Sequence, residues 1–382
     1  IHFLFIEGDF HNIHIFFPYK STLGPTRPIR AKPGPEELTI MVAEFGPALT
    51  PASTPNLLDN NTTLEIEKAS NTYKMSQKIT TKADAQNLLD KYDYFLFDCD
   101  GVIWLGDHLL PSVVETLELL KKQNKTVIFV TNNLTKARKD YLLKFEKLGI
   151  SGIQKLEVFG SSYALAVYVD KILQLPKNKK VWVLGESGIE TELHELGYET
   201  VGGTDPELVA DGVAFNPDHK FLTDLDPDVG CVVAGLTTNL NYLKLSATMQ
   251  YLLKDNKQIP FVATNIDSTF PLKGKLLIGA GSIVETVSFA SGRQPDAVCG
   301  KPNQLMMQLI LADNPGLKEN PAKGIMVGDR LNTDMKFGRD GGLDTLLVLT
   351  GIEKQEVVET LPKGEAPTYF ADKLGDLFEL TQ

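Results

Sequence analysis

The stretch Tyr94-Phe95-Leu96-Phe97-Asp98-Cys99-Asp100-Gly101-Val102 carries four bulky apolar residues directly into two carboxylates and a glycine. A short, continuously apolar run of this kind is typical of a buried central strand. In an open parallel sheet, ligands bind beyond the carboxyl ends of the strands, which is where these charges begin. Asp98 and Asp100 are two residues apart, so on an extended backbone their side chains share a face. Gly101 then lets the chain turn away without a Cβ penalty.

Two carboxylates this close repel each other unless a cation compensates their charge. Mg²⁺ is a suitable partner, because it is a hard ion that takes oxygen ligands and few carboxylates. With the metal present, Asp98 can stay ionised and attack phosphorus. Asp100 can then give a proton to the leaving oxygen and take one back from water. The alternative interpretation is that the two carboxylates cap a loop and do no chemistry.

Length and charge limit the classes of function. The 382 residues, 42% of them hydrophobic, are enough for two domains with substantial cores. A net charge of −11 and a pI near 5.1 give no electrostatic reason to bind nucleic acid or an anionic membrane. No apolar run reaches the length of a membrane span. Cys99, Cys231 and Cys299 lack metal-ligand spacing and favour a reducing compartment, so we expect a cytoplasmic protein, with the nucleus as the second choice.

Residues 1–74 differ from the rest of the chain. They contain eight of the 21 prolines, and no helical or strand period persists in them. We therefore predict a disordered extension. Because Met75 opens a more regular sequence, one interpretation is that it is the natural start and that the preceding residues are not native. The functional alternative is a targeting arm.

Apolar strands and amphipathic helices alternate from residue 75 onward, with an interruption. The predicted helices of the first and last parts are 83–89, 111–123, 136–148 and 304–311, and the predicted strands are 94–97, 125–130, 324–327 and 345–349. This order of strands and helices implies a parallel sheet with right-handed crossovers.

A second α/β unit interrupts this pattern. Its predicted strands are 181–184, 231–234 and 260–263, its predicted helix is 243–253, and none of its strands ends in a carboxylate pair. We therefore predict an α/β fold with a doubly wound, Rossmann-like parallel-sheet core, formed by 75–165 and 295–382. Residues 166–294 form a large inserted α/β cap domain, and 296–302 return the chain to the core.

Two further motifs lie at predicted strand ends, and each of them alone is only weak evidence of function. Thr131-Asn132-Asn133 offers a hydroxyl, amides and N–H groups before a helix, which suits either a phosphate cradle or an ordinary N-cap. Lys301 lies between Gly300 and Pro302. It is either a solvated surface residue or an ammonium aimed at charge developing on a phosphoryl group.

A third feature follows the strand at 324–327. Asp329 can be the second side-chain ligand of Mg²⁺, and Asp334 can orient Lys301 or a metal-bound water. Gly328 frees the backbone before them. The alternative is a capped turn without a chemical role.

The order of the motifs is strand-Asp-x-Asp, strand-Thr, Gly-Lys-Pro and strand-Gly-Asp-x4-Asp. In this order and at these strand ends, residues 90–350 resemble the haloacid dehalogenase superfamily. Segments 97–104, 264–267, 279–282 and 328–334 resemble its 4-nitrophenylphosphatase and phosphoglycolate phosphatase branch, most closely the fungal 4-nitrophenylphosphatases.

The resemblance implies a role for each motif residue. Asp98 would be the nucleophile and a Mg²⁺ ligand. Asp100 would be the acid/base and would bind Mg²⁺ through its backbone carbonyl, and Asp329 would complete the protein ligands. The residues that would hold the phosphate are Thr131, Asn132, Asn133 and Lys301. The inserted unit would be the cap that closes over the site and selects the substrate.

The implied function is a Mg²⁺-dependent phosphomonoesterase acting through an aspartyl-phosphate. Its substrates would be small phosphorylated metabolites such as phosphoglycolate-like acids, with 4-nitrophenyl phosphate as an artificial substrate. The alternatives are a pyridoxal phosphate phosphatase, a phosphotransferase such as a mutase, and a receiver-like phosphate-binding module. Asp100 and the inserted cap argue against a receiver. We expect no nucleic-acid or membrane partner, and the family implies a homodimer formed through the cap.

Phe270 bears on the choice of substrate. It precedes Pro271-Leu272, where the pyridoxal phosphate phosphatases of this branch have a histidine that contacts the cofactor ring. Phenylalanine cannot donate that hydrogen bond, and the loss of a specific polar contact costs discrimination. The residue therefore favours small phosphorylated acids. The alternative is that Phe270 only packs inside the cap.

The N-terminal extension gives the first testable prediction. Because residues 1–74 contribute no motif, we expect their deletion to leave kcat and Tm nearly unchanged. Steady-state kinetics and thermal unfolding of the truncated and full-length chains measure both quantities. A large loss of either would show that the extension packs against the core or the site.

Overall fold

The structure is a computed structural model of the chain. It describes residues 5–7, 14–16, 76–133, 136–209, 215–272, 275–362 and 364–382. The chain divides into two units, 1–60 and 61–382. In the first unit, β1 (Phe5–Glu7) pairs with β2 (His14–Phe16) in an antiparallel arrangement that the sequence did not predict. The remaining residues up to 75 lie outside the described ones, so the disordered extension and the start at Met75 stay predictions.

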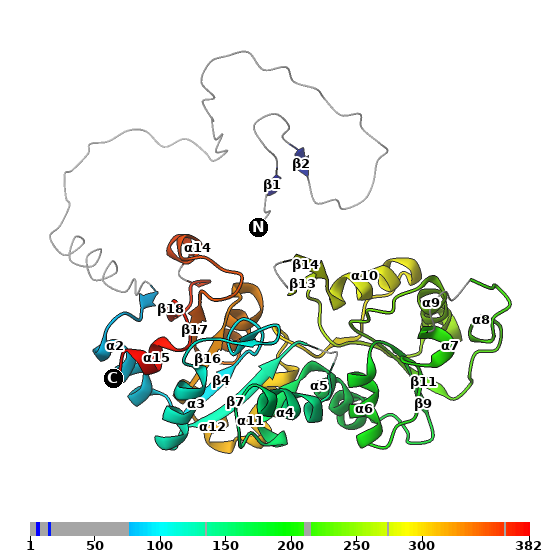
Figure 1. Cartoon of the computed structure of the whole chain (residues 1–382). Helices are drawn as coiled ribbons and strands as arrows, with labels where there is room; N and C mark the ends of the chain where they lie inside the picture. Colours follow the sequence, from blue (N-terminus) through cyan, green and yellow to red (C-terminus); the bar gives the residue numbers. More distant parts are fainter. Residues whose placement is uncertain are drawn as a thin grey trace, which may run out of the picture. The chain divides into compact units, whose positions relative to one another are not determined.

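A seven-stranded, entirely parallel sheet forms the core of the second unit (Figure 1). Its strands, in spatial order, are β3 (Gln77–Lys78), β18 (Tyr369–Ala371), β17 (Asp344–Val348), β16 (Gly324–Gly328), β4 (Tyr94–Phe97), β7 (Thr126–Thr131) and β8 (Val158–Gly160). Strand β4 therefore lies between β16 and β7. Because the strands are parallel, the three segments that follow them meet at one edge of the sheet.

Strand β4 is apolar because both of its faces are buried. Phe95 and Phe97 stack with ring centroids 6.2 Å apart on one face, while Leu96 packs into a different hydrophobic cluster on the other. All three side chains are fully buried. A strand covered on both faces has no position for a polar side chain, which explains why the run is continuous rather than alternating.

Helices cover both faces of this sheet. The helices of the core are α2 (Lys82–Lys91), α3 (Val113–Lys122), α4 (Arg138–Lys147), α5 (Ser161–Val167), α11 (Leu305–Asp313), α12 (Pro315–Glu319), α13 (Lys336–Asp340), α14 (Gln355–Thr360) and α15 (Asp376–Glu379). Helices α2, α3, α4 and α15 pack on the face of Phe95 and Phe97. Helices α5, α11, α12 and α13 pack on the face of Leu96. Among the described residues, no helix combines the length and the apolar character that a membrane crossing requires.

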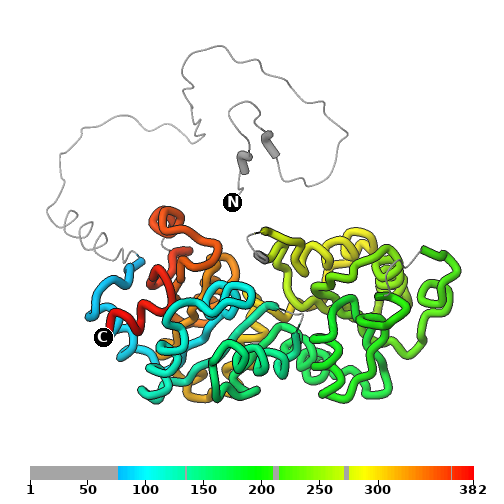
Figure 2. The backbone as a smooth tube through the Cα atoms, viewed as in Figure 1, coloured from blue at the N-terminus to red at the C-terminus, as the bar shows by residue number. Residues whose placement is uncertain are grey.

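A second parallel sheet is formed by the middle of the chain. Its strands, in spatial order, are β10 (Thr200–Gly202), β9 (Lys180–Leu184), β11 (Val229–Ala234), β12 (Phe261–Ala263) and β15 (Ala297–Val298). Its helices are α6 (Ser187–Glu195), α7 (Pro206–Val209), α8 (Lys220–Thr223), α9 (Tyr242–Lys257) and α10 (Ala280–Ser291). Figure 2 shows the green and yellow segments forming a lobe of their own, while the cyan, orange and red segments lie together.

Two hairpins and four short helical turns complete the described structure. The hairpins are β5 (Trp104–Leu105) with β6 (His108–Leu109) and β13 (Thr269–Leu272) with β14 (Lys275–Ile278). The turns are η1 (Lys155–Glu157), η2 (Tyr168–Ile172), η3 (Pro321–Lys323) and η4 (Leu331–Met335).

The predicted α/β fold class is confirmed, and each predicted helix and strand overlaps an observed one. One segment differs from the prediction. Residues 296–302 were expected to return the chain to the first sheet, but β15 within them pairs with β12 in the second sheet. The domain boundaries at 165 and 295 stay a proposal.

Candidate active site

Three buried carboxylates meet beyond the carboxyl ends of β4 and β16. Asp98 directly follows β4, and Asp329 and Asp334 follow β16. One oxygen from each lies within 4.8 Å of the others, close enough for a single cation. The parallel pairing of β4 with β16 brings these residues together, although more than 200 positions separate them in the chain.

Lys301 enters this cluster from the segment that follows β15. Its ammonium donates to Asp98 Oδ1 at 2.6 Å, to Asp334 Oδ1 at 2.7 Å and to the Val130 carbonyl at 2.7 Å. The residue is 2% exposed, so it is not the solvated surface lysine of the alternative interpretation. Three acceptors for three ammonium protons fix the position of the charge.

Asp334 and Asp329 differ in what their oxygens bind. Besides Lys301, Asp334 accepts the backbone N–H groups of Asp329 and Arg330 through Oδ2, each at 3.2 Å. Within the described part of the chain, the Asp329 carboxylate accepts no hydrogen bond and forms no ion pair, although it is 2% exposed. Asp98 Oδ2 is likewise without a described partner. The site therefore presents two buried carboxylates with unused oxygens.

Burial and the neighbouring charges shift the pKa values of these groups. Burial raises the pKa of Asp98 to about 7, although the charge of Lys301 acts in the opposite direction. Burial, followed by repulsion from Asp334 and Asp98, raises the pKa of Asp329 well above its usual value. Burial alone would lower the pKa of Lys301, but Asp334 and Asp98 raise it. Three carboxylates around one ammonium would be better balanced by a further cation, and their hard oxygen donors suit Mg²⁺.

Gly101 makes room for Asp329. Its φ of +93° lies in the left-handed region, and a Cβ there would stand 2.6 Å from Asp329 Oδ2. The glycine that follows the two carboxylates is therefore needed both for the turn and for the close approach of the third.

Asp100 is held apart from the carboxylate cluster. The Trp104 indole N–H donates to its Oδ1 at 3.0 Å, and the Asn133 amide donates to its Oδ2 at 3.3 Å. The tight turn after β4 sets up the first contact, because Gly101 N–H donates to the Trp104 carbonyl at 2.7 Å. Sequence reasoning assigned no role to Trp104, although it ends the segment 97–104 that carries the family resemblance.

The Thr131-Asn132-Asn133 segment follows β7. The Thr131 hydroxyl is buried, accepts the Asn133 backbone N–H at 3.1 Å and lies 3.4 Å from the Tyr141 hydroxyl. Asn132 is already engaged: its amide holds the Lys301 backbone, with Nδ2 donating to the carbonyl and Oδ1 accepting the N–H, both at 2.9 Å. In this structure Asn132 fixes the lysine loop, and its contact with phosphate stays a prediction.

Two residues that follow β12, Asn265 and Asp267, also contact this site. In the sequence, they contribute only to the family resemblance. Asp267 Oδ2 accepts a second Asn132 Nδ2 hydrogen bond at 2.9 Å, and Asn265 Nδ2 donates to the Asn132 carbonyl at 2.8 Å. Both residues follow β12 of the second sheet. The signal in the sequence was the polar segment at the end of an apolar strand.

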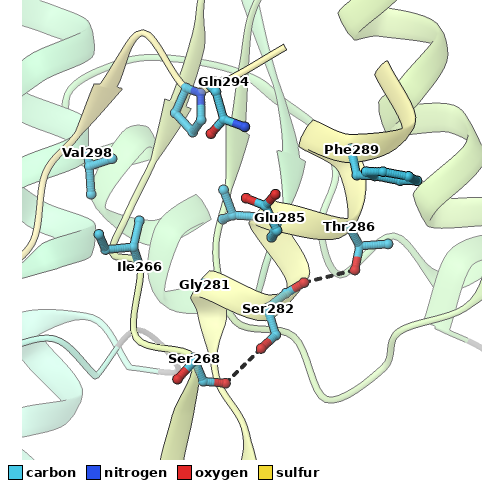
Figure 3. Close-up of a pocket in the computed structure, with 11 residues that line it drawn as sticks. Ile266, Ser268, Gly281, Ser282, Glu285, Thr286, Phe289, Gln294 and Val298 are labelled. Carbon is cyan, nitrogen blue, oxygen red and sulfur yellow. Dashed lines mark hydrogen bonds between the residues drawn. The ribbon is translucent and has the colours of Figure 1, made fainter. Parts of the chain in front are cut away.

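Two hollows lie near the cap segment 266–268. A small pocket of about 170 Å³ lies between this segment, Pro302 and the loop 330–333 of the core. A larger hollow of about 870 Å³ runs along α10 (Figure 3), with Ile266, Val284 and Phe289 among its lining residues. The predicted site residues line neither hollow, but Pro302 and Arg330 of the smaller one directly follow Lys301 and Asp329 in the chain.

Comparison with known families identifies the class of protein. Residues 95–199 match the model of the haloacid dehalogenase-like hydrolases, and residues 298–377 match a HAD-hydrolase-like model. The chain is 42% identical over 307 residues to 4-nitrophenylphosphatase of Schizosaccharomyces pombe, covering 80% of this chain and 99% of the relative. It is 37% identical over 362 residues to phosphoglycolate phosphatase 1A of Arabidopsis thaliana, covering 86% and 95%.

Solved structures of two phosphatases superpose on this chain. The 4-nitrophenylphosphatase of Thermotoga maritima superposes with a TM-score of 0.62 at 29% identity, covering 77% of this chain and 99% of that one. Glycerol phosphate phosphatase of Mycobacterium tuberculosis in complex with magnesium superposes with a TM-score of 0.58 at 25% identity, covering 76% and 77%. The chain belongs to the haloacid dehalogenase-like hydrolases, which confirms the resemblance seen in the sequence.

Proposed function

We propose that this protein is a Mg²⁺-dependent phosphomonoesterase that acts through an aspartyl-phosphate on Asp98. The observation that carries the proposal is the buried Asp98 carboxylate, which is held by Lys301 through one oxygen and leaves the other available for attack. The names of the relatives, which include 4-nitrophenylphosphatase and phosphoglycolate phosphatase, support the same class of reaction.

The residues fit a magnesium ion. The carboxylates of Asp98 and Asp329 would hold it together with the backbone carbonyl of Asp100, as the family resemblance implies. Bound Mg²⁺ supplies positive charge that offsets the carboxylates and the phosphate oxygens. The magnesium complex of the mycobacterial relative supports this choice of metal.

The chain's own residues then carry out two displacements. An Asp98 oxygen forms a bond to phosphorus while the bond from phosphorus to the leaving oxygen breaks. Asp100 gives that oxygen a proton, and Trp104 and Asn133 hold the carboxyl group in place for the transfer. Water then attacks phosphorus, Asp100 accepts its proton, and Asp98 is released as a carboxylate.

Lys301 is suited to stabilise charge in both displacements. Its ammonium is fixed by Asp98, Asp334 and the Val130 carbonyl, so it need not reorganise when charge develops on the phosphoryl group. Thr131 and Asn133 lie at the end of the neighbouring strand β7 and are proposed to contact the phosphate with it.

The proposed substrate is a small phosphorylated acid. Phe270 is half-buried and packs against the hydrophobic cluster of the second sheet, which supports the interpretation that it serves packing. A packed phenyl ring offers no polar contact to a pyridine ring. Pyridoxal phosphate therefore remains the second candidate, favoured by no described contact.

We also propose a homodimer formed through the cap. The support is a group of exposed apolar side chains on the cap, which monomers usually avoid. These are Ile266, Leu276, Ile278 and Phe289.

The nucleophile is tested by Asp98→Asn. The amide keeps the size of the side chain but removes the attacking charge, so we expect kcat on 4-nitrophenyl phosphate to fall by orders of magnitude with the fold intact. Circular dichroism and Tm serve as the control for folding. Near-normal turnover by the variant would rule out covalent catalysis by this residue.

The metal is tested by chelation. Exhaustive removal of divalent ions should abolish activity, and Mg²⁺ should restore it. Ca²⁺ should inhibit, because its larger and looser coordination misplaces the nucleophile. Full activity in the chelated protein would contradict the metal assignment.

Substrate choice is tested by kinetics on two compounds. We expect a higher kcat/KM for phosphoglycolate than for pyridoxal phosphate, because the cap position that would contact the pyridine ring carries the packed Phe270. A clear preference for pyridoxal phosphate would overturn this choice and leave the phosphatase proposal standing.

A further inference from the structure

A small polar pocket adjoins the carboxylate cluster and has no role in the proposed chemistry so far. It measures about 170 Å³ and lies between the cap segment 266–268 and the core residues Pro302, Arg330, Asn332 and Thr333. Its walls therefore come from three segments, which follow β12, β15 and β16 in the chain.

The residues that line the pocket are connected to the candidate active site. Pro302 follows Lys301 and Arg330 follows Asp329 in the chain. Asp267 is joined to the site through Asn132, whose amide also holds the Lys301 backbone. A group covalently attached to a phosphate at Lys301 would thus have this pocket next to it.

Arg330 is the cation of this pocket. Its backbone is fixed, because its N–H donates to Asp334 Oδ2 at 3.2 Å. Its side chain is half-buried, and across the described residues its guanidinium makes no hydrogen bond and no ion pair. A guanidinium offers five N–H donors in a planar fork, which matches a carboxylate.

Asp267 is the nearby carboxylate of the pocket, but it does not form an ion pair with the Arg330 guanidinium. It is close enough for Arg330 to influence it: burial raises the pKa of the Asp267 carboxyl, whereas the Asn132 hydrogen bond and the charge of Arg330 act to lower it. Its Oδ2 is used by Asn132, and no nitrogen of Arg330 comes within ion-pair distance. The pocket therefore lacks an anion at Arg330.

We propose that Arg330 binds the carboxylate of the leaving group when the substrate is a small phosphorylated acid. This assignment rests on the proposed phosphatase function and names the residue that gives it selectivity. Asn332 and Thr333, which line the same pocket, carry neutral side-chain donors.

The size of the pocket agrees with this ligand. A volume of 170 Å³ corresponds to roughly six waters at their share of liquid volume. That room is sufficient for an acid of two or three carbons.

A different role for Arg330 would be to attract Asp267 and hold the cap against the core. That role would affect every substrate alike, whereas a carboxylate-binding role affects only substrates that carry the acid. The two are separated by comparing phosphoglycolate with its amide, phosphoglycolamide, which has nearly the same shape without the second charge.

The experiment measures kcat/KM for phosphoglycolate, phosphoglycolamide and 4-nitrophenyl phosphate in the full-length protein with saturating Mg²⁺. The variants are Arg330→Met, which keeps the length of the side chain, and Arg330→Lys, which keeps the charge without the fork. The matched control is Lys336→Met, which removes an exposed cation whose one ion pair among the described residues is with Asp340, four residues on.

We expect Arg330→Met to lower kcat/KM for phosphoglycolate by about 10- to 100-fold, the range for a hydrogen-bonded charge. The kcat/KM values for phosphoglycolamide and 4-nitrophenyl phosphate, whose leaving groups are neutral, should fall by much less. For phosphoglycolate, Arg330→Lys should give a kcat/KM between those of the wild-type protein and Arg330→Met. The control should stay within about twofold for all three, as for other exposed pairs. If Arg330→Met unfolds, judged by Tm, Arg330→Lys carries the test.

The proposal would be overturned if the ratio of kcat/KM for phosphoglycolate to kcat/KM for phosphoglycolamide stayed at its wild-type value in the Arg330 variants. A parallel fall of kcat/KM for all three substrates would also overturn it. Failure of the proposed function gives a different result. In that case the wild-type protein would hydrolyse none of the three compounds, and the carboxylate site would fall with it.

Discussion

The Lys301 ammonium, buried between Asp98 and Asp334, is the interaction on which the site depends. With its side chain 2% exposed, Lys301 can remain charged only because two carboxylates and a carbonyl surround it. Removing one partner from such a buried pair typically costs about 3–5 kcal/mol, since the remaining charge is left uncompensated. The same contacts that keep the lysine charged also orient the Asp98 carboxylate.

The two sheets are tied together at this point. Asn132 links the Lys301 backbone to Asp267, and Asn265 holds the Asn132 carbonyl from the same cap segment. A hydrophobic cluster also runs from Leu96 of the first sheet to Val181 and Val233 of the second. The segment that follows β12, the lysine loop and Asp98 are thus joined in one network of hydrogen bonds.

Much of this could be predicted from the sequence, because the signals are local. The continuously apolar run before Asp98 predicted a central strand, and the motifs at strand ends predicted that Asp98 and Asp329 meet, but not that Asp334 joins them while Asp100 stays apart. The return of the chain to the core was predicted less well. β15 has only two residues, and its pairing with β12 of the second sheet depends on a partner 35 positions away in the chain.

Other features depend on contacts that no local pattern encodes. The contact of Asn132 with phosphate stays a prediction, and no local pattern showed that its amide also holds the backbone of Lys301, 169 residues away. Asp334 was expected only to orient neighbours, yet it is part of the carboxylate cluster itself. No local pattern encodes that the Arg330 guanidinium lies in a pocket formed by three distant segments and has no anionic partner among the described residues.

The most direct test of the account is to trap the covalent intermediate. Borohydride reduces an acyl phosphate to an alcohol, so an aspartyl-phosphate formed during turnover of 4-nitrophenyl phosphate becomes a homoserine that peptide mapping can locate. The account predicts substrate-dependent homoserine at position 98. Modification at another residue, or none while the enzyme turns over and a known acyl phosphate is trapped in parallel, would contradict it.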